Sequence, residues 1–389
     1  MGLPYLSSRI ADPRTVGADV KAVVWVARMR RSPAEAQAAR EAKLELMAEK
    51  LQAAVEGLTT GEDWKRAIEF AARFRAKSFR NTLLIFAQHA EAYEQGRVSE
   101  PVPTYVAGFK QWQQLDRSVA GQSGYMIYAP VMGRFASKNP SDPMSWRRLA
   151  QREKPAAGEV VRSKMVNVKP AYVWDVSQTT GAEIPERPMP RLLEGEAPAG
   201  LWTGLAGQVT AERFTLADAA GASAIMGANG MTDYGSRVVT VRADMDDAAR
   251  VKTLAHELGH VRMHDPAESV THHRGIREVE AESVAMMIGA AHGMDTSDYT
   301  IPYVASWASS VADKEPVDVV RETGERVRRV ALDILDKLPD TGIGDGYPPG
   351  LDRSGPDAER ETTTERTAEL GAAAPMRSTA SVDVAVPAL

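Results

Sequence analysis

Apolar residues recur every three to four positions between residues 244 and 263, which is the spacing of one buried helix face. Acidic residues at 244, 246 and 247 favour a helix start, and Asp265-Pro266 favours its end. The apolar stripe consists of Val251, Leu254, Ala255 and Leu258. The pattern therefore predicts a helix with one buried and one polar face.

Other segments show helical or strand periods. A mostly apolar stretch that carries three acids predicts a second buried helix at 275–290. Helical patterns also cover about 33–57, 63–77 and 78–96. Alternating or β-branched runs predict strands at 125–130, 169–176 and 237–242. Helices and strands gathered in separate runs predict an α+β fold.

Charge divides the chain into a basic and an acidic half. Residues 1–190 hold 28 Lys and Arg against 20 Asp and Glu, a net charge of +8, although the whole chain carries −5. Pro and Gly gather where the balance changes, and the last 50 residues are rich in Gly, Pro, Thr, Ala and Glu. We therefore predict two domains: an irregular arm at 1–32, a basic domain at 33–186, a linker at 187–200, an acidic domain at 201–339 and a disordered tail at 340–389.

The chain contains no cysteine, which excludes disulfides and thiolate-rich metal sites and is typical of a reducing cytoplasm. No apolar run reaches the roughly 20 residues that span a bilayer, and the N-terminus lacks the pattern of a signal peptide. These features predict a soluble, cytoplasmic protein with no membrane partner.

The predicted helix at 244–263 carries the candidate chemistry. His256 and His260 are four residues apart, so both rings lie on one face and can bind one metal ion. Glu257 follows the first histidine, where it can hold and deprotonate a water molecule. This HExxH pattern predicts a zinc peptidase with one Zn²⁺ per chain. A helix whose histidines only pack is the alternative, but two of seven histidines on one face beside a glutamate fit it poorly.

A catalytic zinc needs a third protein ligand. The metzincin arrangement is excluded, because Met263 and Pro266 stand where that class has glycine and histidine. Glu278 and Glu282 lie one turn apart on the second buried helix, so we predict Glu278 as the ligand and Glu282 as the carboxylate that orients a ligand histidine. Exchange of these two roles stays open. Glu280, on another face, is interpreted as a structural or surface acid.

Other candidates near the motif are weaker. His264 continues the four-residue spacing, but it lies roughly 12 Å along the helix from His256, so we expect it to cap the helix end. His272 and His273 are interpreted as solvated loop residues. An oxyanion donor is expected in such a site, and Tyr299 and Tyr303 are the candidates, with packing as their alternative role.

The order of HExxH, a short polar connection and an E-x-E-A-E helix resembles the ImmA/IrrE and PolyVal-type metallopeptidases, which are gluzincin-like. The resemblance implies that a short strand before the HExxH helix pairs with an extended substrate, and Arg237–Arg242 occupies that place. An ordinary edge strand without that role is the alternative.

Four cations at 73–80 can form a phosphate-binding stripe or a solvated helix face. Three strings, at 78–85, 107–112 and 174–179, resemble the N-terminal single-stranded-DNA-binding domain of ArdC-type antirestriction proteins. The turn at 120–124 keeps the glycines of that family but lacks its lysines, which implies weaker DNA binding. Together the stripe and the strings give the DNA-binding candidates Arg73, Arg75, Lys77, Arg80, Asn81, Lys110 and Trp112.

We therefore predict a zinc metallopeptidase with an attached single-stranded-DNA-binding domain and an unknown protein substrate. The resemblance implies an antirestriction or regulatory role on a mobile element. The alternative is a non-catalytic single-stranded-DNA-binding antirestriction protein with a structural zinc site. Glu257 favours the first hypothesis, because a structural site does not need a general base.

Overall fold

The computed structural model describes residues 32–184, 195–264, 274–297, 299, 301, 304–309, 311, 314–338 and 344–351. By internal contacts the chain divides into two units, Met1–Leu46 and Met47–Leu389. Helix α2 (Pro33–Glu56) provides the described part of the first unit and the start of the second. Every other element belongs to the second unit. Residues 1–31 of the predicted arm lie outside the described residues.

Two capped helices follow α2. The Thr60 side chain accepts a hydrogen bond from the Asp63 backbone, and Asp63 bonds back to Thr60, which begins α3 (Gly61–Arg73). Ser78 caps α4 (Phe79–Glu94) by accepting a single hydrogen bond from the Asn81 backbone. Helix α3 ends four residues earlier than the pattern at 63–77 predicts.

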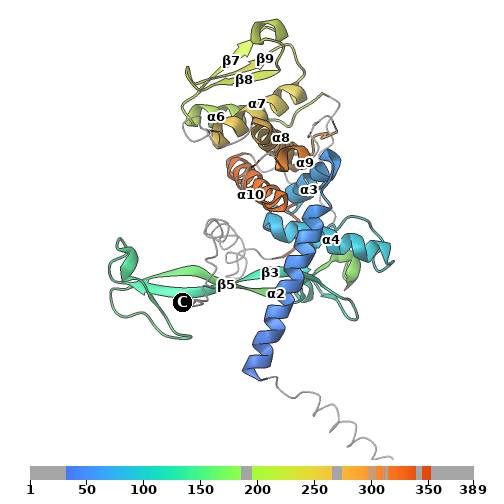
Figure 1. The fold of residues 1–389 in the computed structure, drawn as a ribbon, viewed down its shortest axis with the longest axis vertical. Helices are drawn as coiled ribbons and strands as arrows, with labels where there is room; N and C mark the ends of the chain where they lie inside the picture. The colour runs from blue at the N-terminus through green and yellow to red at the C-terminus, as the bar shows by residue number, and fades with distance from the viewer. Residues whose placement is uncertain are drawn as a thin grey trace, which may run out of the picture. The chain divides into compact units, whose positions relative to one another are not determined.

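A four-stranded antiparallel sheet follows, with the strand order β1-β5-β3-β4. Strands β3 and β5 are longer than the sequence predicts and form one continuous two-stranded ribbon (Figure 1). The bounds are β1 (Val106–Gly108), β3 (Tyr125–Ser137), β4 (Arg147–Arg148) and β5 (Val160–Asp175). Helix α5 (Phe109–Gln114), the short pair β2 (Arg117–Ser118) and β6 (Thr180–Gly181), and the 3-10 turns η1 (Pro143–Ser145) and η2 (Val176–Gln178) complete this part.

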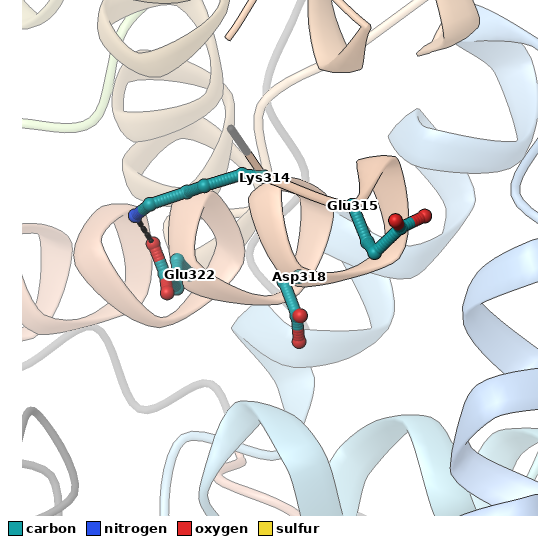
Figure 2. A pocket seen from close by; sticks show the side chains of 4 residues that line it. All are labelled: Lys314, Glu315, Asp318 and Glu322. Atoms are coloured by element: carbon teal, nitrogen blue, oxygen red, sulfur yellow. Dashed lines mark hydrogen bonds and ion pairs between the residues drawn. The ribbon is translucent and has the colours of Figure 1, made fainter. Parts of the chain in front are cut away.

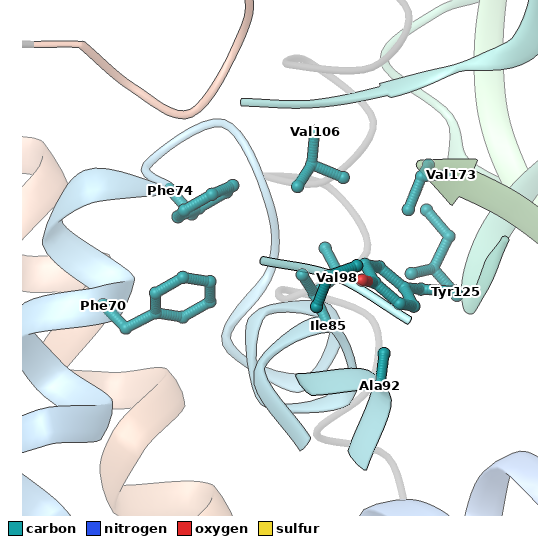
Figure 3. Close-up of a cluster of buried hydrophobic side chains, with 9 residues drawn as sticks. Phe70, Phe74, Ile85, Ala92, Val98, Val106, Tyr125 and Val173 are labelled. Carbon is teal, nitrogen blue, oxygen red and sulfur yellow. The ribbon is translucent and has the colours of Figure 1, made fainter. Parts of the chain in front are cut away.

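The sheet packs on α3 and α4 through a shared apolar core. Phe70 of α3 and Phe74 at its C-cap face Ile85 of α4, while β1, β3 and β5 contribute Val106, Tyr125 and Val173 (Figure 3). All of these side chains are buried. Burial of this apolar area holds the base of the ribbon on the helices.

A second, three-stranded sheet has β9 at its centre, in the order β7-β9-β8. Strand β9 pairs parallel with β7 and antiparallel with β8, so both of its edges are occupied. The predicted edge strand at 237–242 is therefore a central strand, and the prediction that it pairs with substrate does not fit this structure. The bounds are α6 (Leu201–Ala211), β7 (Thr215–Ala219), η3 (Ala222–Ile225), β8 (Gly230–Asp233) and β9 (Val238–Arg242).

Four helices complete the second unit: α7 (Asp247–Met263), α8 (Arg274–Ala291), α9 (Val304–Ala308) and α10 (Pro316–Leu335). Asp246 caps α7 by accepting a hydrogen bond from the Ala249 backbone at 2.8 Å. Helices α7 and α8 approach closely at Gly259, where an added Cβ would lie 3.2 Å from the Ala281 Cα. Gly289 of α8 faces the Tyr299 hydroxyl.

Helices from both halves of the sequence share one core. The Trp64 indole of α3 donates to Ser283 of α8 at 2.8 Å and packs against Trp307 of α9. Gly324 of α10 lies directly against the buried Phe79 ring of α4. The mixed α+β class is confirmed. The division into two domains at 187–200 stays a prediction.

Residues 344–351 lie inside the predicted disordered tail, yet they are packed. Gly346 accepts a backbone hydrogen bond from Val106, and the Tyr347 hydroxyl accepts one from Lys77 at 2.7 Å. The Tyr347 ring also receives the Lys77 ammonium over its face. The tail prediction therefore began too early, and residues 352–389 lie outside the described part of the chain.

Candidate metal centre

Helices α7 and α8 bring three donor groups together. The Nε2 atoms of His256 and His260 lie 3.0 Å apart, and a Glu278 oxygen lies 3.7 Å from the first and 3.6 Å from the second. One atom from each residue falls within 4.8 Å of the others. Two imidazoles and one carboxylate are a known ligand set for catalytic Zn²⁺, so the donor chemistry fits a zinc ion.

Glu282 lies on the other side of the His256 ring. One of its oxygens is 2.9 Å from the His256 Nδ1, and the other is 3.5 Å from the Lys252 ammonium. A proton on Nδ1 that is held by this carboxylate leaves the Nε2 lone pair free for a metal. The geometry therefore favours Glu278 as the candidate ligand and Glu282 as the carboxylate that orients His256.

The His260 ring has an outer partner that the sequence analysis missed. His264 does end α7, but its ring turns back so that the two Nδ1 atoms lie 2.9 Å apart. Its Nε2 lies 3.0 Å from Glu280, which is 1% exposed and also binds Arg326 of α10. Glu280 is thus a buried partner of His264. The spacing of three histidines at every fourth residue was the available signal.

Glu257 is 6% exposed and is oriented by strand β8. The Thr232 hydroxyl donates to a Glu257 carboxylate oxygen at 2.6 Å. Gly230 permits this approach, because an added Cβ would lie 2.7 Å from the other Glu257 oxygen and 2.6 Å from the Thr253 methyl group. The strand and the HExxH helix therefore meet at the predicted general base.

Of the two candidate oxyanion donors, the structure describes Tyr299, whose hydroxyl is already bonded to a backbone carbonyl. Tyr299 is 3% exposed, and its hydroxyl donates to the Ala285 carbonyl at 3.2 Å. Its burial also raises the pKa of the phenol. Packing was the alternative role considered for Tyr299. Three other candidates lie outside the described residues: Tyr303, His272 and His273.

Three predicted DNA-binding side chains are buried and already bonded. Lys77 binds Tyr347, the Asn81 amide pairs with both backbone groups of Tyr128, and the Trp112 indole donates to the Trp174 carbonyl. Such groups are not available to a DNA strand. Of the other candidates, Arg73 and Lys110 are exposed, and Arg75 and Arg80 are partly buried.

The electrostatics of the donor cluster lead to a prediction for zinc binding. Burial lowers the pKa of His256, but hydrogen bonds to Glu278 and Glu282 outweigh it and raise that pKa to about 9. Hydrogen bonds from His256 and His260 hold the pKa of Glu278 well below its usual range. Without metal at pH 7, His256 therefore carries a proton that Zn²⁺ must displace.

We expect zinc binding at pH 7 to release about one proton from His256, and the apparent affinity to fall about tenfold per unit of pH below pH 9. Titration calorimetry in buffers of different ionisation enthalpy measures the released protons. Zinc binding with no proton release would contradict the protonated state of His256 in the metal-free protein.

A surface hollow lies apart from the donor cluster, around the start of α10. It is lined by Lys314, Glu315, Asp318 and Glu322, and the Lys314 ammonium pairs with Glu322 at 2.5 Å (Figure 2). None of these residues belongs to the metal cluster, so the chemistry of the site does not depend on this hollow.

The segment that contains the cluster is similar to a known family. Residues 209–301 match the Peptidase_M78 model, described as the IrrE N-terminal-like domain. The IrrE-like segment runs from α6 to the loop before α9, and it includes the three donors, Glu257 and Thr232. This part of the chain is metallopeptidase-like.

A longer similarity extends beyond the IrrE-like segment. An uncharacterized protein of Bacillus anthracis is 24% identical over 278 residues, which cover 66% of this chain and 45% of that protein. The chain thus matches less than half the length of this relative. No solved structure matches the chain. In the part that the structure describes, no helix is long and apolar enough to cross a membrane.

Proposed function

We propose that the protein is a zinc-dependent peptidase whose chain also binds single-stranded DNA. The observation that supports the peptidase most is the placement of Glu257 beside the His256, His260 and Glu278 donors, with its carboxylate held by Thr232. A structural zinc site needs ligands but no such base. The similarity of residues 209–301 to the IrrE-like family agrees with this proposal.

The residues divide the chemistry among them. When bound to His256, His260 and Glu278, Zn²⁺ supplies the Lewis acidity that polarises a scissile carbonyl and acidifies water. Glu257 accepts a proton from the attacking water and returns it to the amine nitrogen when the C–N bond breaks. The Thr232 hydroxyl keeps the Glu257 carboxylate in place for both transfers.

Strand β8 is the natural place for a substrate backbone. Among the described strands it pairs with β9 alone, so its other edge is free to add an extended peptide. It also contains Thr232, which touches Glu257. This proposal transfers to β8 the substrate-pairing role that the family resemblance implied for residues 237–242.

The peptidase proposal is tested with the full chain and a mixture of unstructured peptides, analysed by mass spectrometry. We expect cleavage by the zinc-loaded protein, loss of cleavage after chelation and recovery when Zn²⁺ is restored. Glu278→Gln, which removes a proposed ligand, serves as the inactive control. Cleavage that is insensitive to chelation would exclude the zinc mechanism.

The β3–β5 ribbon supports the DNA proposal better than the buried candidates do. Residues 129–169 contain nine Lys and Arg but three Asp and Glu, and no acid lies within 129–138 or 160–169. Arg162 and Lys164 share a face with Phe135, and the Arg162 guanidinium lies 4.7 Å from the Trp146 ring centre. Cations beside aromatic rings can neutralise phosphates while bases stack.

We predict that the double variant Arg162→Gln and Lys164→Gln binds a labelled single-stranded oligonucleotide more weakly and with a smaller salt dependence. Each lost phosphate contact lowers the slope of log affinity against log salt by about 0.7 for single strands, so the slope should fall by about 1.4. Fluorescence anisotropy across a salt series measures both quantities.

A matched control removes two exposed cations that flank α10, one before its start and one after its end, Lys314→Gln and Lys337→Gln. It changes the net charge equally but should leave the slope unchanged. Equal slopes for both double variants would show that the ribbon does not contact the DNA. Tighter binding of a duplex of equal length would argue against single-strand recognition.

A non-catalytic DNA-binding protein with a structural zinc site is the competing proposal, and it predicts zinc and DNA binding without peptide cleavage. Either function is compatible with an antirestriction or regulatory role on a mobile element. Cytoplasmic location stays a prediction from the sequence.

A further inference from the structure

A buried chain of polar groups leads from the metal cluster to helix α10. It runs from His260 through His264 and Glu280 to Arg326, with 2.9 Å between the two histidines and 3.0 Å between His264 and Glu280. Glu280 is 1% exposed and His264 is 4% exposed. The peptidase chemistry described above uses neither residue directly.

The hydrogen-bond directions along this chain are determined at both ends. To bind a metal through Nε2, a neutral His260 must carry its proton on Nδ1, which then donates to the His264 Nδ1. His264 is left with its proton on Nε2, and this proton is donated to Glu280. The second Glu280 oxygen accepts from Arg326. Each group has one role, and all the roles agree.

The two ligand histidines are therefore supported differently. His256 bonds directly to Glu282, which is partly exposed and lies close to Lys252. His260 reaches its carboxylate only through the His264 ring. A buried carboxylate without partners would be costly, so the His264 and Arg326 bonds are needed to hold the Glu280 carboxylate in this position.

We infer that His264 and Glu280 are positioning residues that hold His260 in the tautomer that binds zinc. This inference rests on the proposed zinc site, but not on peptide cleavage. Arg326 also takes part in this positioning. It occupies one Glu280 oxygen, so it determines which atom of the side chain at position 280 faces His264.

The variant Glu280→Gln tests the direction of the hydrogen bonds from His260 to Glu280. Arg326 can bind only the amide oxygen, so the amide NH₂ is left to face His264 Nε2 and donate to it. That reversal makes His264 donate to His260 and shifts the His260 proton to Nε2, where it competes with zinc. We expect zinc affinity to fall about 10- to 100-fold, as is typical when a partner of a ligand histidine is lost.

A second substitution should rescue this loss. Adding Arg326→Met to Glu280→Gln frees the amide oxygen to turn toward His264 and accept, which restores the original direction. We expect the double variant to recover most of the lost zinc affinity. If Glu280 acted only through general stability, removing a further polar contact at Arg326 would not restore the zinc affinity of the protein.

Zinc affinity of the full chain is measured by competition with a chromophoric chelator, and circular dichroism of the metal-free proteins checks the fold. Glu322→Gln, the same chemical change at an exposed site, is the control and should match the wild type. His264→Phe removes the acceptor for His260 while keeping an aromatic ring, so it should lose affinity even if Glu280→Gln does not fold.

Unchanged zinc affinity in folded Glu280→Gln or His264→Phe, or the absence of rescue, would overturn the inference. Zinc binding by the wild type without any peptide cleavage would count against the peptidase alone. Failure of the wild type to bind zinc would overturn both proposals.

Discussion

Glu257→Gln is expected to lower peptide cleavage by about 10²- to 10⁴-fold, the range attributed to general acid–base catalysis, while zinc stays bound. Glutamine keeps the size of the side chain and an oxygen that can accept from Thr232, but it cannot take a proton from water. Glu257 is not one of the three donors, so the metal should be retained. Cleavage of a peptide identified in the mixture and the zinc content are measured on the same sample.

The comparison with Glu278→Gln gives this experiment its control. That variant should lose zinc and cleavage together, whereas Glu257→Gln should lose cleavage alone. Full cleavage by Glu257→Gln would exclude Glu257 as the base. Two results together would instead favour the non-catalytic alternative. The wild type would hold zinc without cleaving any peptide, and Glu257→Gln would keep the biological effect of the wild type.

Gly324→Ala is expected to reduce the free energy of unfolding by about 3 kcal/mol, near the upper end for overpacking of a core. Its Cβ would overlap the Phe79 ring, which is fully buried and packs on Trp64, so neither the ring nor the helix can move away easily. The higher helix propensity of alanine offsets only about 1 kcal/mol of this cost.

Gly207→Ala provides the opposite case within another helix, α6. No atom lies within 4 Å of the added Cβ, so alanine should stabilise the protein by about 0.5–1 kcal/mol. Urea unfolding of the metal-free proteins measures both changes. A Gly324→Ala protein at least as stable as the wild type would show that the Gly324 contact with Phe79 does not control the packing of α10 on α4.

Local patterns explain how much of the fold could be predicted. The helix at 247–263 has a capping aspartate and an apolar stripe, so neighbouring residues suffice to define it. Strand order depends on distant partners instead. Nothing within 237–242 distinguishes a central strand from an edge strand, because both alternate in the same way.

The donor cluster was predictable from spacing, but its surroundings were not. His264 and Glu280 are 16 residues apart in the sequence and meet only when α7 and α8 pack together. Lys77 has the sequence pattern of a surface cation, yet its partner Tyr347 lies 270 residues later in the chain. Contacts of this kind connect residues whose local sequence carries no sign of the partner.

The core shared by α3, α4, α8 and α10 has a consequence for dissecting the protein. Separate expression of the two predicted halves would expose Trp64 and Phe79 on one fragment and Ser283 and Gly324 on the other. Each piece would carry an uncovered apolar surface and would tend to aggregate. A backbone cut made within 185–194 of the folded protein would leave complementary fragments held together by that core, so they should copurify as one particle.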